Sequence, residues 1–542
     1  MLMGGGIVTM KRISVRRVAS VIVTAMAMTL VFATLGWAMM PQWNTRPYTK
    51  HIVIASADTT ITPAHANIPH EGRYRTRETR LSIKTGDGVT LPAVLREPVG
   101  APGPRPACLF IHGSGTSGAE DFGDIANAMA SAGIVTLVPA KRNDNYTVLH
   151  RDYPRFAREY GRSLDVLRGR IGVDPAKTGI YAESEGTWIA TILTSKRQDI
   201  AFAVLTSAPV FNGREQMAMA VSAYTHEAGA PKPVVKDMAK LMSLDYAPFD
   251  LAYADFDADR YLKSLTMPVL VNYGTYDTAM PIEQGAQRII ATANKSGNEN
   301  VTVRYFAGNH QMRAGEGLFT PNLPLAEGYT QALEKLGERC DCRNQSRWMG
   351  NASSRRCNTS PALRRVATYQ IRYRRLAWRA GRSDGGRARA DRDGGDIRYW
   401  LDCVFWLQTL LAGRRSVATV RAVHATPSEL GAAQRRMLHG IAGLSAGIGT
   451  AVMVITGLLY GYMSAVGVSA VLVMPQPRLF AVGWVVLRIA TMLLVVLFAW
   501  EMERVWYCRA DIVGVRRVIC VMVALGTLAT LMTLAFWGLF SL

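Results

Sequence analysis

The stretch Thr178-Gly-Ile-Tyr-Ala-Glu-Ser-Glu-Gly186 decides the fold of the middle of this chain. A short apolar run ends at Ala182, and a helix-length segment begins after Ser184. A serine on such a strand-to-helix turn needs small residues two positions away on each side, because the backbone passes close there; Ala182 and Gly186 meet that need. The turn projects the Ser184 hydroxyl toward a base, which a serine needs to become a nucleophile at neutral pH. The stretch therefore predicts a nucleophile at the end of a buried strand.

Residues 75–338 around this turn alternate short apolar runs with longer amphipathic segments. The runs that we predict as buried strands are Ala107–Ile111, Ile134–Pro139, Thr178–Ala182, Phe202–Thr206, Val269–Tyr273 and Val301–Phe306. Helix-length segments lie between them, among them Asp124–Ala132, Tyr153–Arg170 and Ile282–Lys295. Such alternation predicts an α/β fold, with a mostly parallel sheet and helices on both faces.

A glycine-rich segment, Ile111-His112-Gly113-Ser114-Gly115, directly follows one predicted strand. A reaction that passes through a tetrahedral oxyanion needs two amide donors aimed at that oxygen. The backbone amide of Glu185 can supply one donor, and the amide of Ser114, or less readily of Gly115, the other. Taken alone, the segment also fits an ordinary strand-to-helix turn. His112 precedes this loop, which favours a structural role over that of a general base.

Together these motifs resemble the α/β-hydrolase superfamily, most closely its esterase-like and dienelactone-hydrolase-like branch. That family orders its catalytic residues as serine, then an acid, then histidine. The resemblance places the acid on Asp277, just past the strand Val269–Tyr273, and the base on His310, just past the strand Val301–Phe306. It implies that an acyl-serine forms on Ser184 and is then hydrolysed. The sequence departs from the family pattern at Ala182, where glycine is usual.

Other residues of the region carry weaker indications. Lys141 and Arg142 follow a predicted strand end on the same side of the sheet; they are candidates to bind a substrate carboxylate or phosphate, or else to pair with carboxylates such as Asp144. In the family that this region resembles, an insertion at about residues 211–262 caps the pocket. No zinc spacing, phosphate loop or dinucleotide fingerprint appears, so we expect neither a metal nor a cofactor.

The two ends of the chain are apolar. Residues 1–40 hold an apolar run, Val18–Met39, behind four basic residues, which predicts an uncleaved transmembrane anchor; a cleaved signal peptide is the alternative. Residues 41–74 follow as a linker. Residues 428–542 hold three stretches long enough to span a bilayer, Leu438–Tyr462, Leu479–Trp500 and Val518–Phe540.

Charge and topology leave one conflict. The basic flank of the anchor predicts that its N-terminal side is cytoplasmic, so residues 75–338 would be exported. The loop that carries Arg504, Arg509, Arg516 and Arg517 should also be cytoplasmic. Three C-terminal spans put that loop outside, whereas four put it inside, and the sequence does not decide between them.

Residues 339–427 form a compositionally distinct segment. Its first part, residues 339–398, has sixteen arginines and no lysine, which predicts a disordered linker or a basic segment on anionic lipid or nucleic acid; a shifted reading frame would give the same composition. The formal charge of the chain is 62 − 41 = +21 and its mean hydropathy is +0.07. Since much of that charge lies here and beside the spans, membrane lipid is the expected partner and nucleic acid is not. Seven cysteines in 542 residues exclude a disulfide scaffold.

The sequence thus predicts a multi-pass protein of the cytoplasmic membrane whose catalytic domain is a serine hydrolase outside the cytoplasm. We expect small acyl esters or thioesters as substrates. A serine peptidase of the same fold and an inactive membrane scaffold or receptor are the alternatives. The acyl chain, the leaving group and the oligomeric state stay open, because a fold alone does not fix a substrate.

Overall fold

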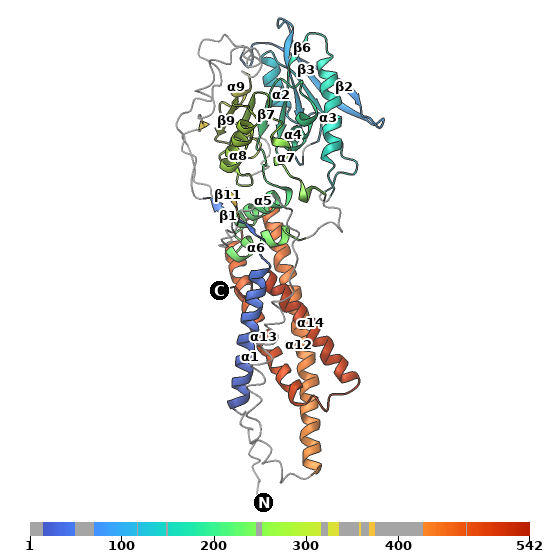
Figure 1. Ribbon diagram of the computed structural model, residues 1–542, viewed down its shortest axis with the longest axis vertical. Coiled ribbons are helices and arrows are strands. Elements are labelled where there is room, and N and C mark those ends of the chain that lie inside the picture. Colours follow the sequence, from blue (N-terminus) through green and yellow to red (C-terminus); the bar gives the residue numbers. More distant parts are fainter. Residues whose placement is uncertain are drawn as a thin grey trace, which may run out of the picture.

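The computed structural model describes residues 15–48, 70–115, 117–147, 150–244, 252–315, 323–334, 357–358, 368–373, 427–472 and 474–541. Within these ranges the chain has two parts, a head built around a β-sheet and a stalk of four long helices (Figure 1). Two helices, which we call the cap helices, lie between the sheet and the stalk: α5 (Gly213–Glu227) and α6 (Lys232–Met242).

In the described residues, the head contains a nine-stranded sheet in the order β10-β9-β8-β7-β6-β4-β5-β3-β2. Its strands are β2 (Thr76–Lys84), β3 (Thr90–Pro98), β4 (Arg105–Ile111), β5 (Val135–Pro139), β6 (Val173–Glu183), β7 (Ala203–Thr206), β8 (Val269–Gly274), β9 (Val301–Phe306) and β10 (Cys357–Asn358). Strands β4 to β9 are the six that the sequence predicts, and they pair in parallel. Strand β3 pairs antiparallel with both β2 and β5. The predicted α/β class with a mostly parallel sheet is therefore confirmed.

Helices cover both faces of the sheet, as the apolar pattern of the strands requires. In β4, Leu109 and Ile111 belong to one buried cluster, and Cys108 and Phe110 belong to another on the opposite face. Helices α3 (Tyr153–Arg168), α4 (Glu185–Lys196) and α8 (Ile282–Lys295) pack on the first face; α2 (Gly123–Ser131) and α9 (Tyr329–Glu334) pack on the second. A 3₁₀ turn (Ala252–Asp255) and the short α7 (Asp259–Leu262) lie between the cap helices and β8. A strand buried on both faces needs apolar residues at every position, which explains why these strands could be predicted from the sequence.

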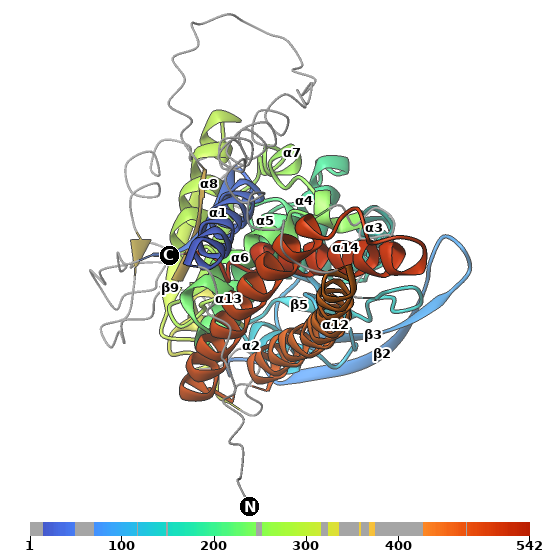
Figure 2. The same ribbon diagram turned by 90° about the horizontal axis from the view of Figure 1, so that it is seen from below.

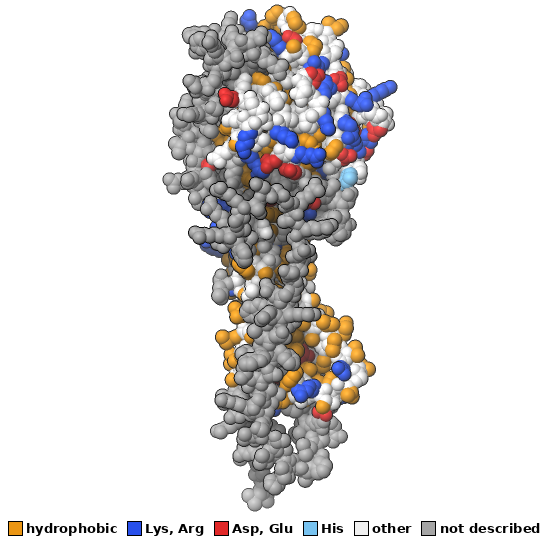
Figure 3. Space-filling view, viewed as in Figure 1, with side chains coloured by type: hydrophobic (Ala, Val, Ile, Leu, Met, Phe, Trp, Pro, Cys, Tyr) orange, Lys and Arg blue, Asp and Glu red, His pale blue; other side chains and the backbone are white. Residues whose placement is uncertain are grey.

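The stalk consists of α1 (Val15–Ala38), α12 (Pro427–Val471), α13 (Pro477–Tyr507) and α14 (Val515–Phe536). Each contains a stretch long and apolar enough to cross a membrane, which bears out the predicted anchor and the three C-terminal stretches as candidate spans. Figure 2, seen along the stalk, shows α1 beside α13 and α14. Large apolar side chains cover the surface of the stalk, whereas charged ones cover the head (Figure 3). Apolar surface of this extent is a property of lipid-facing helices.

A small two-stranded sheet joins segments far apart in sequence at the base of the head. Strand β1 (Trp43–Tyr48) follows the first stalk helix and pairs antiparallel with β11 (Thr368–Tyr373). The hydroxyls of Thr45 and Ser222, the latter on α5, lie 2.8 Å apart. Both predicted linkers, residues 41–74 and 339–427, thus contribute a strand, and most of their other residues lie outside the described ones.

The cap helices are also tied directly to the stalk. The Lys240 ammonium of α6 donates to the carbonyl of Phe536, at the end of α14, over 2.7 Å and lies 3.0 Å from the Asp237 carboxylate. The amide of Gln476 donates to the carbonyl of Ala228 over 2.9 Å. Both members of the Lys240–Asp237 pair are buried. The head is therefore mounted on the stalk through the elements that cover the carboxyl edge of its sheet.

Candidate active site

Ser184 lies on a tight turn between β6 and α4, as its sequence context predicts. Its φ is +53° and its ψ is −124°, a conformation that side-chain-bearing residues rarely adopt. A Cβ on Gly186 would come within 2.5 Å of the Ile111 carbonyl oxygen, and one on Gly113 would come within 3.1 Å of the Ser184 Cβ. The small residues are thus required, because the turn packs directly against the glycine-rich loop after β4.

Asp277 and His310 lie at the carboxyl ends of β8 and β9. Nδ1 of His310 is 2.7 Å from Oδ2 of Asp277, and both side chains are buried. The other oxygen of Asp277 accepts from the amides of Ala279 and Met280, over 3.1 and 3.2 Å. Because the carboxylate is fixed by the backbone, it can hold the imidazole in one orientation, as a general base requires.

The end of β7 brings the histidine loop and the serine turn together. The amide of Ser184 donates to the carbonyl of Thr206 over 2.8 Å. The hydroxyl of the next residue, Ser207, donates to the carbonyl of His310 over 2.6 Å. Ser184 and His310 are therefore anchored on two consecutive residues of one strand end. Ser207 is not among the residues predicted from the sequence; its polar character directly after a buried strand is the signal that could have found it.

Two acidic groups act on the imidazole. Burial lowers the pKa of His310, but Asp277, by its charge and its hydrogen bond, and Glu183 raise it more, so the net pKa lies above the ordinary 6.5. Burial raises the pKa of Glu183 itself to about 7, against the opposing effect of His310. Glu183 directly precedes the candidate nucleophile, so a second carboxyl group tunes the same base.

Two backbone amides beside the serine turn are the candidate oxyanion donors. Among the described residues, neither the amide of Ser114 nor that of Glu185 donates a hydrogen bond. One follows Gly113 in the loop after β4, and the other begins α4, where a helix N-terminus favours negative charge. They are the donors that the sequence analysis proposed for an oxyanion.

Lys141 and Arg142 point into different surroundings. Arg142 is bound by three carboxylates: Asp87, Asp144, at 2.7 Å from Nη2, and Glu159, at 3.2 Å from Nη1. The alternative that the sequence analysis kept open for this residue, pairing with carboxylates, describes its contacts. The Lys141 ammonium donates to the carbonyl of Gly113 and lies 3.7 Å from Oε2 of Glu185, beside the candidate oxyanion donors.

His112 has structural contacts on both ring nitrogens. Nδ1 lies 3.0 Å from the Tyr160 hydroxyl, and Nε2 lies 2.9 Å from the Gly118 carbonyl. Burial lowers the pKa of His112 to about 4, so the ring is neutral near pH 7. These contacts agree with a structural role.

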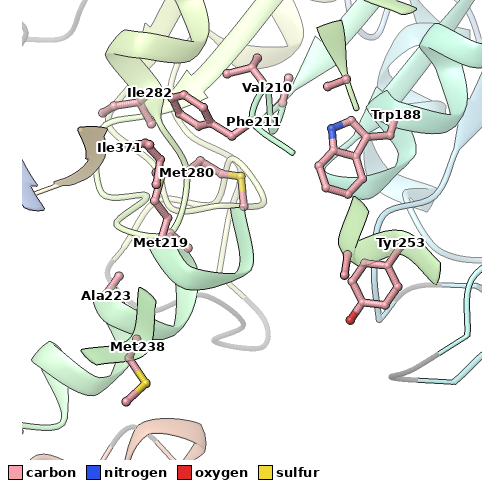
Figure 4. Close-up of a cluster of buried hydrophobic side chains, with 14 of the residues drawn as sticks. Trp188, Val210, Phe211, Met219, Ala223, Met238, Tyr253, Met280, Ile282 and Ile371 are labelled. Atoms are coloured by element: carbon pink, nitrogen blue, oxygen red, sulfur yellow. The ribbon is translucent and has the colours of Figure 1, made fainter. Parts of the chain in front are cut away.

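Cap helix α5 lies beside the loop that carries Asp277. Met219 is buried and lies near Met280, which follows Asp277 in the chain, whereas the buried Met238 lies farther away, beyond Ala223 (Figure 4). The amide of Gln216 donates to the carbonyl of Ala279 over 3.2 Å, so α5 also touches the acid loop. In the described residues, no group of three or more His, Cys, Asp or Glu side chains is arranged to hold a metal ion.

No protein-family model and no curated protein matches the sequence. Solved structures to which the chain is similar are hydrolases of the α/β type. A protein described as a dienelactone hydrolase, from Klebsiella pneumoniae subsp. pneumoniae MGH 78578, is 14% identical over 45% of this chain and 92% of its own, with a TM-score of 0.32. The Pyrococcus furiosus esterase Pf2001 is 17% identical over 48% of this chain and 92% of its own, with a TM-score of 0.34.

Proposed function

We propose that this chain is a membrane-anchored serine hydrolase that cleaves carboxylic esters or thioesters through an acyl-serine intermediate. The observation that carries the proposal is the buried Asp277–His310 hydrogen bond, anchored on the strand end that also holds Ser184. A buried acid and imidazole beside a strained serine turn form a nucleophile with its base and the group that orients the base.

In the proposed reaction, Nε2 of His310 removes the hydroxyl proton of Ser184 as the oxygen attacks the carbonyl carbon. Asp277 stabilises the imidazolium that forms, and the amides of Ser114 and Glu185 hold the tetrahedral oxyanion. The imidazolium then protonates the departing alkoxide or thiolate, which leaves an acyl-serine. Water, activated by the same imidazole, releases the carboxylic acid and restores the hydroxyl.

The stalk anchors this chemistry at the membrane in our proposal. The basic loop after α13 lies at the same end of the stalk as the start of α1, since the Arg17 guanidinium lies 5.0 Å from the ring of Tyr507. Both basic segments therefore face one side, which the positive-inside rule makes cytoplasmic. The head lies at the opposite end of the stalk and is extracytoplasmic in this arrangement (Figure 1).

Labelling of the serine tests the chemistry. Membranes with wild type, Ser184→Ala or Ser163→Ala are treated with a fluorophosphonate probe. Ser163 is a buried serine of α3 whose hydroxyl bonds only within its helix in the described structure, which makes it the matched control. We expect labelling of wild type and Ser163→Ala and none of Ser184→Ala; equal labelling of all three would refute the nucleophile. Comparing the turnover of aryl esters with that of aminoacyl amides then separates an esterase from a peptidase. If the wild type neither turns over a substrate nor reacts with the probe, the alternative of an inactive scaffold is favoured.

A second experiment tests the orientation. A cysteine replaces Gly297, at an exposed turn of the head, or Val513, in the loop between α13 and α14. A membrane-impermeant maleimide on intact cells is expected to label the first variant above the wild-type background but not the second. The reverse pattern would place the head in the cytoplasm.

A further inference from the structure

Lys141 is a buried cation at the back of the candidate oxyanion loop. Its side chain is 1% exposed, and its ammonium donates to the carbonyl of Gly113. The ammonium also lies 3.7 Å from the carboxylate of Glu185 and 4.5 Å from the centre of the Tyr146 ring. A buried charge is stable only where such partners replace water.

The carbonyl of Gly113 and the amide of Ser114 belong to the same peptide group. A cation bound to that carbonyl oxygen draws electron density from the peptide nitrogen, because the two atoms share one delocalised system. The N–H of Ser114 then becomes a stronger donor, as hydrogen bonds in a chain polarise one another. The same contact fixes the plane of the peptide and hence the direction of the N–H.

The other candidate donor is tied to the same ammonium through its side chain. The Glu185 carboxylate accepts from the Tyr146 hydroxyl over 2.6 Å and from Arg151 over 3.2 Å, besides its pairing with Lys141. Two cations thus face one carboxylate, which leaves a net positive charge beside the place where the oxyanion forms. Fixed charge and dipoles at that place stabilise the transition state more than the neutral ester.

We propose that Lys141 is a positioning residue of the oxyanion hole, which orients and polarises the Gly113–Ser114 peptide and links it to Glu185. The inference rests on the proposed function and adds to it a residue that does not touch the substrate. It replaces the reading of Lys141 as a substrate-binding residue.

The test compares Lys141→Met, which keeps the length of the side chain but loses its charge, with wild type. Lys84→Met, an exposed lysine of β2, is the matched control. The readouts are kcat and KM on a p-nitrophenyl ester and the inhibition constants of an aryl trifluoromethyl ketone and of its methyl ketone. The first ketone adds the serine and carries an oxyanion, whereas the second does not.

We expect kcat of Lys141→Met to fall about 10- to 100-fold, below the loss for deleting a whole oxyanion donor, with KM changed less than about threefold. The trifluoromethyl ketone should lose affinity by the same factor as kcat, and the methyl ketone should lose none. Lys141→Arg, which keeps a cation, should recover part of kcat. Lys84→Met should match wild type.

Three results would overturn the inference. One is a kcat of Lys141→Met within twofold of wild type; another is an equal loss of affinity for both ketones, which a merely structural role would cause. Should Lys141→Met not fold, Lys141→Gln carries the test, since it removes the charge and keeps a polar side chain. That variant should lose affinity for the trifluoromethyl ketone alone. The third result that would overturn the inference is a variant that binds both ketones as the wild type does, or loses affinity for both equally. A wild-type protein without turnover or Ser184 labelling would instead refute the proposed function.

Discussion

Replacing Gly186 by alanine tests how closely the serine turn depends on its contact with the oxyanion loop. The new Cβ would lie 2.5 Å from the Ile111 carbonyl oxygen and 2.7 Å from that of His112. Ordinary contact begins near 3.4 Å, so the turn and the loop must separate by about 3.4 − 2.5 = 0.9 Å. Both partners are backbone atoms, so no flexible side chain can move aside.

That displacement separates Ser184 and the amide of Glu185 from the amide of Ser114. A misplacement of about 1 Å in an active site costs about 10²-fold in rate, or about 2.7 kcal/mol in the barrier. Overpacking of a buried site also lowers the free energy of unfolding by about 1–3 kcal/mol. We therefore expect Gly186→Ala to react with the fluorophosphonate about 100 times more slowly while the protein still folds.

The assay is the second-order labelling rate of purified protein in detergent, with the melting temperature measured on the same samples. The matched control is Gly161→Ala in α3, a buried glycine whose Cβ would meet only the tip of Leu193 at 3.4 Å. The control should label like wild type. A labelling rate of Gly186→Ala within twofold of wild type would refute the claim that contact between the turn and the loop sets the site.

Four further predictions concern the acid, the proposed catalytic histidine, the neighbouring Glu183 and the junction between head and stalk. Asp277→Asn should lower kcat about 10⁴-fold, because the amide favours the wrong imidazole tautomer; steady-state kinetics at a fixed pH check this, and a loss under tenfold contradicts it. Since His310 must be neutral to accept a proton and its pKa is raised, kcat/KM should increase with pH through a midpoint above 6.5. Glu183→Gln removes one cause of that rise, so its pH profile should shift to lower pH; an unchanged midpoint contradicts the assignment. Lys240→Met leaves the buried Asp237 carboxylate unpaired and should lower the free energy of unfolding in detergent by about 3–5 kcal/mol; an unchanged melting temperature would mean that the junction does not stabilise the head.

The parts of the fold that sequence predicts are those where one physical demand acts on every residue. Strand β9 has all six residues buried, and its predicted and observed bounds coincide at Val301 and Phe306. Strand β2 escaped because it is an edge strand with charged residues along its length and only partial burial. The pairing of β1 with β11 escaped for another reason: it joins segments more than 300 residues apart, and no local pattern records such a partner.

The candidate site divides in the same way. Ser184, Asp277 and His310 were identifiable because each follows a recognisable strand in a known order. The roles of Ser207 and Tyr146 were not, since each acts through a contact to a backbone carbonyl or a distant carboxylate that only the folded chain creates. Arg142 and Lys141 are adjacent in sequence, but the path of the chain after β5 directs them to different partners. Arg142 binds Glu159, whereas Lys141 lies beside Glu185, and the sequence alone does not show this difference.

The conflict between the charge of the loop after α13 and the number of C-terminal spans follows from counting spans in chain order. Counting three C-terminal spans assumes that the first of them, α12, runs opposite to the anchor α1. In the structure α1 and α12 both run toward the head, α13 runs away from it and α14 returns, so the loop between α13 and α14 lies beside the start of α1. With that arrangement, the start of α1 and the loop between α13 and α14 satisfy the positive-inside rule together, and the parity is that of the alternative with four C-terminal crossings, not three.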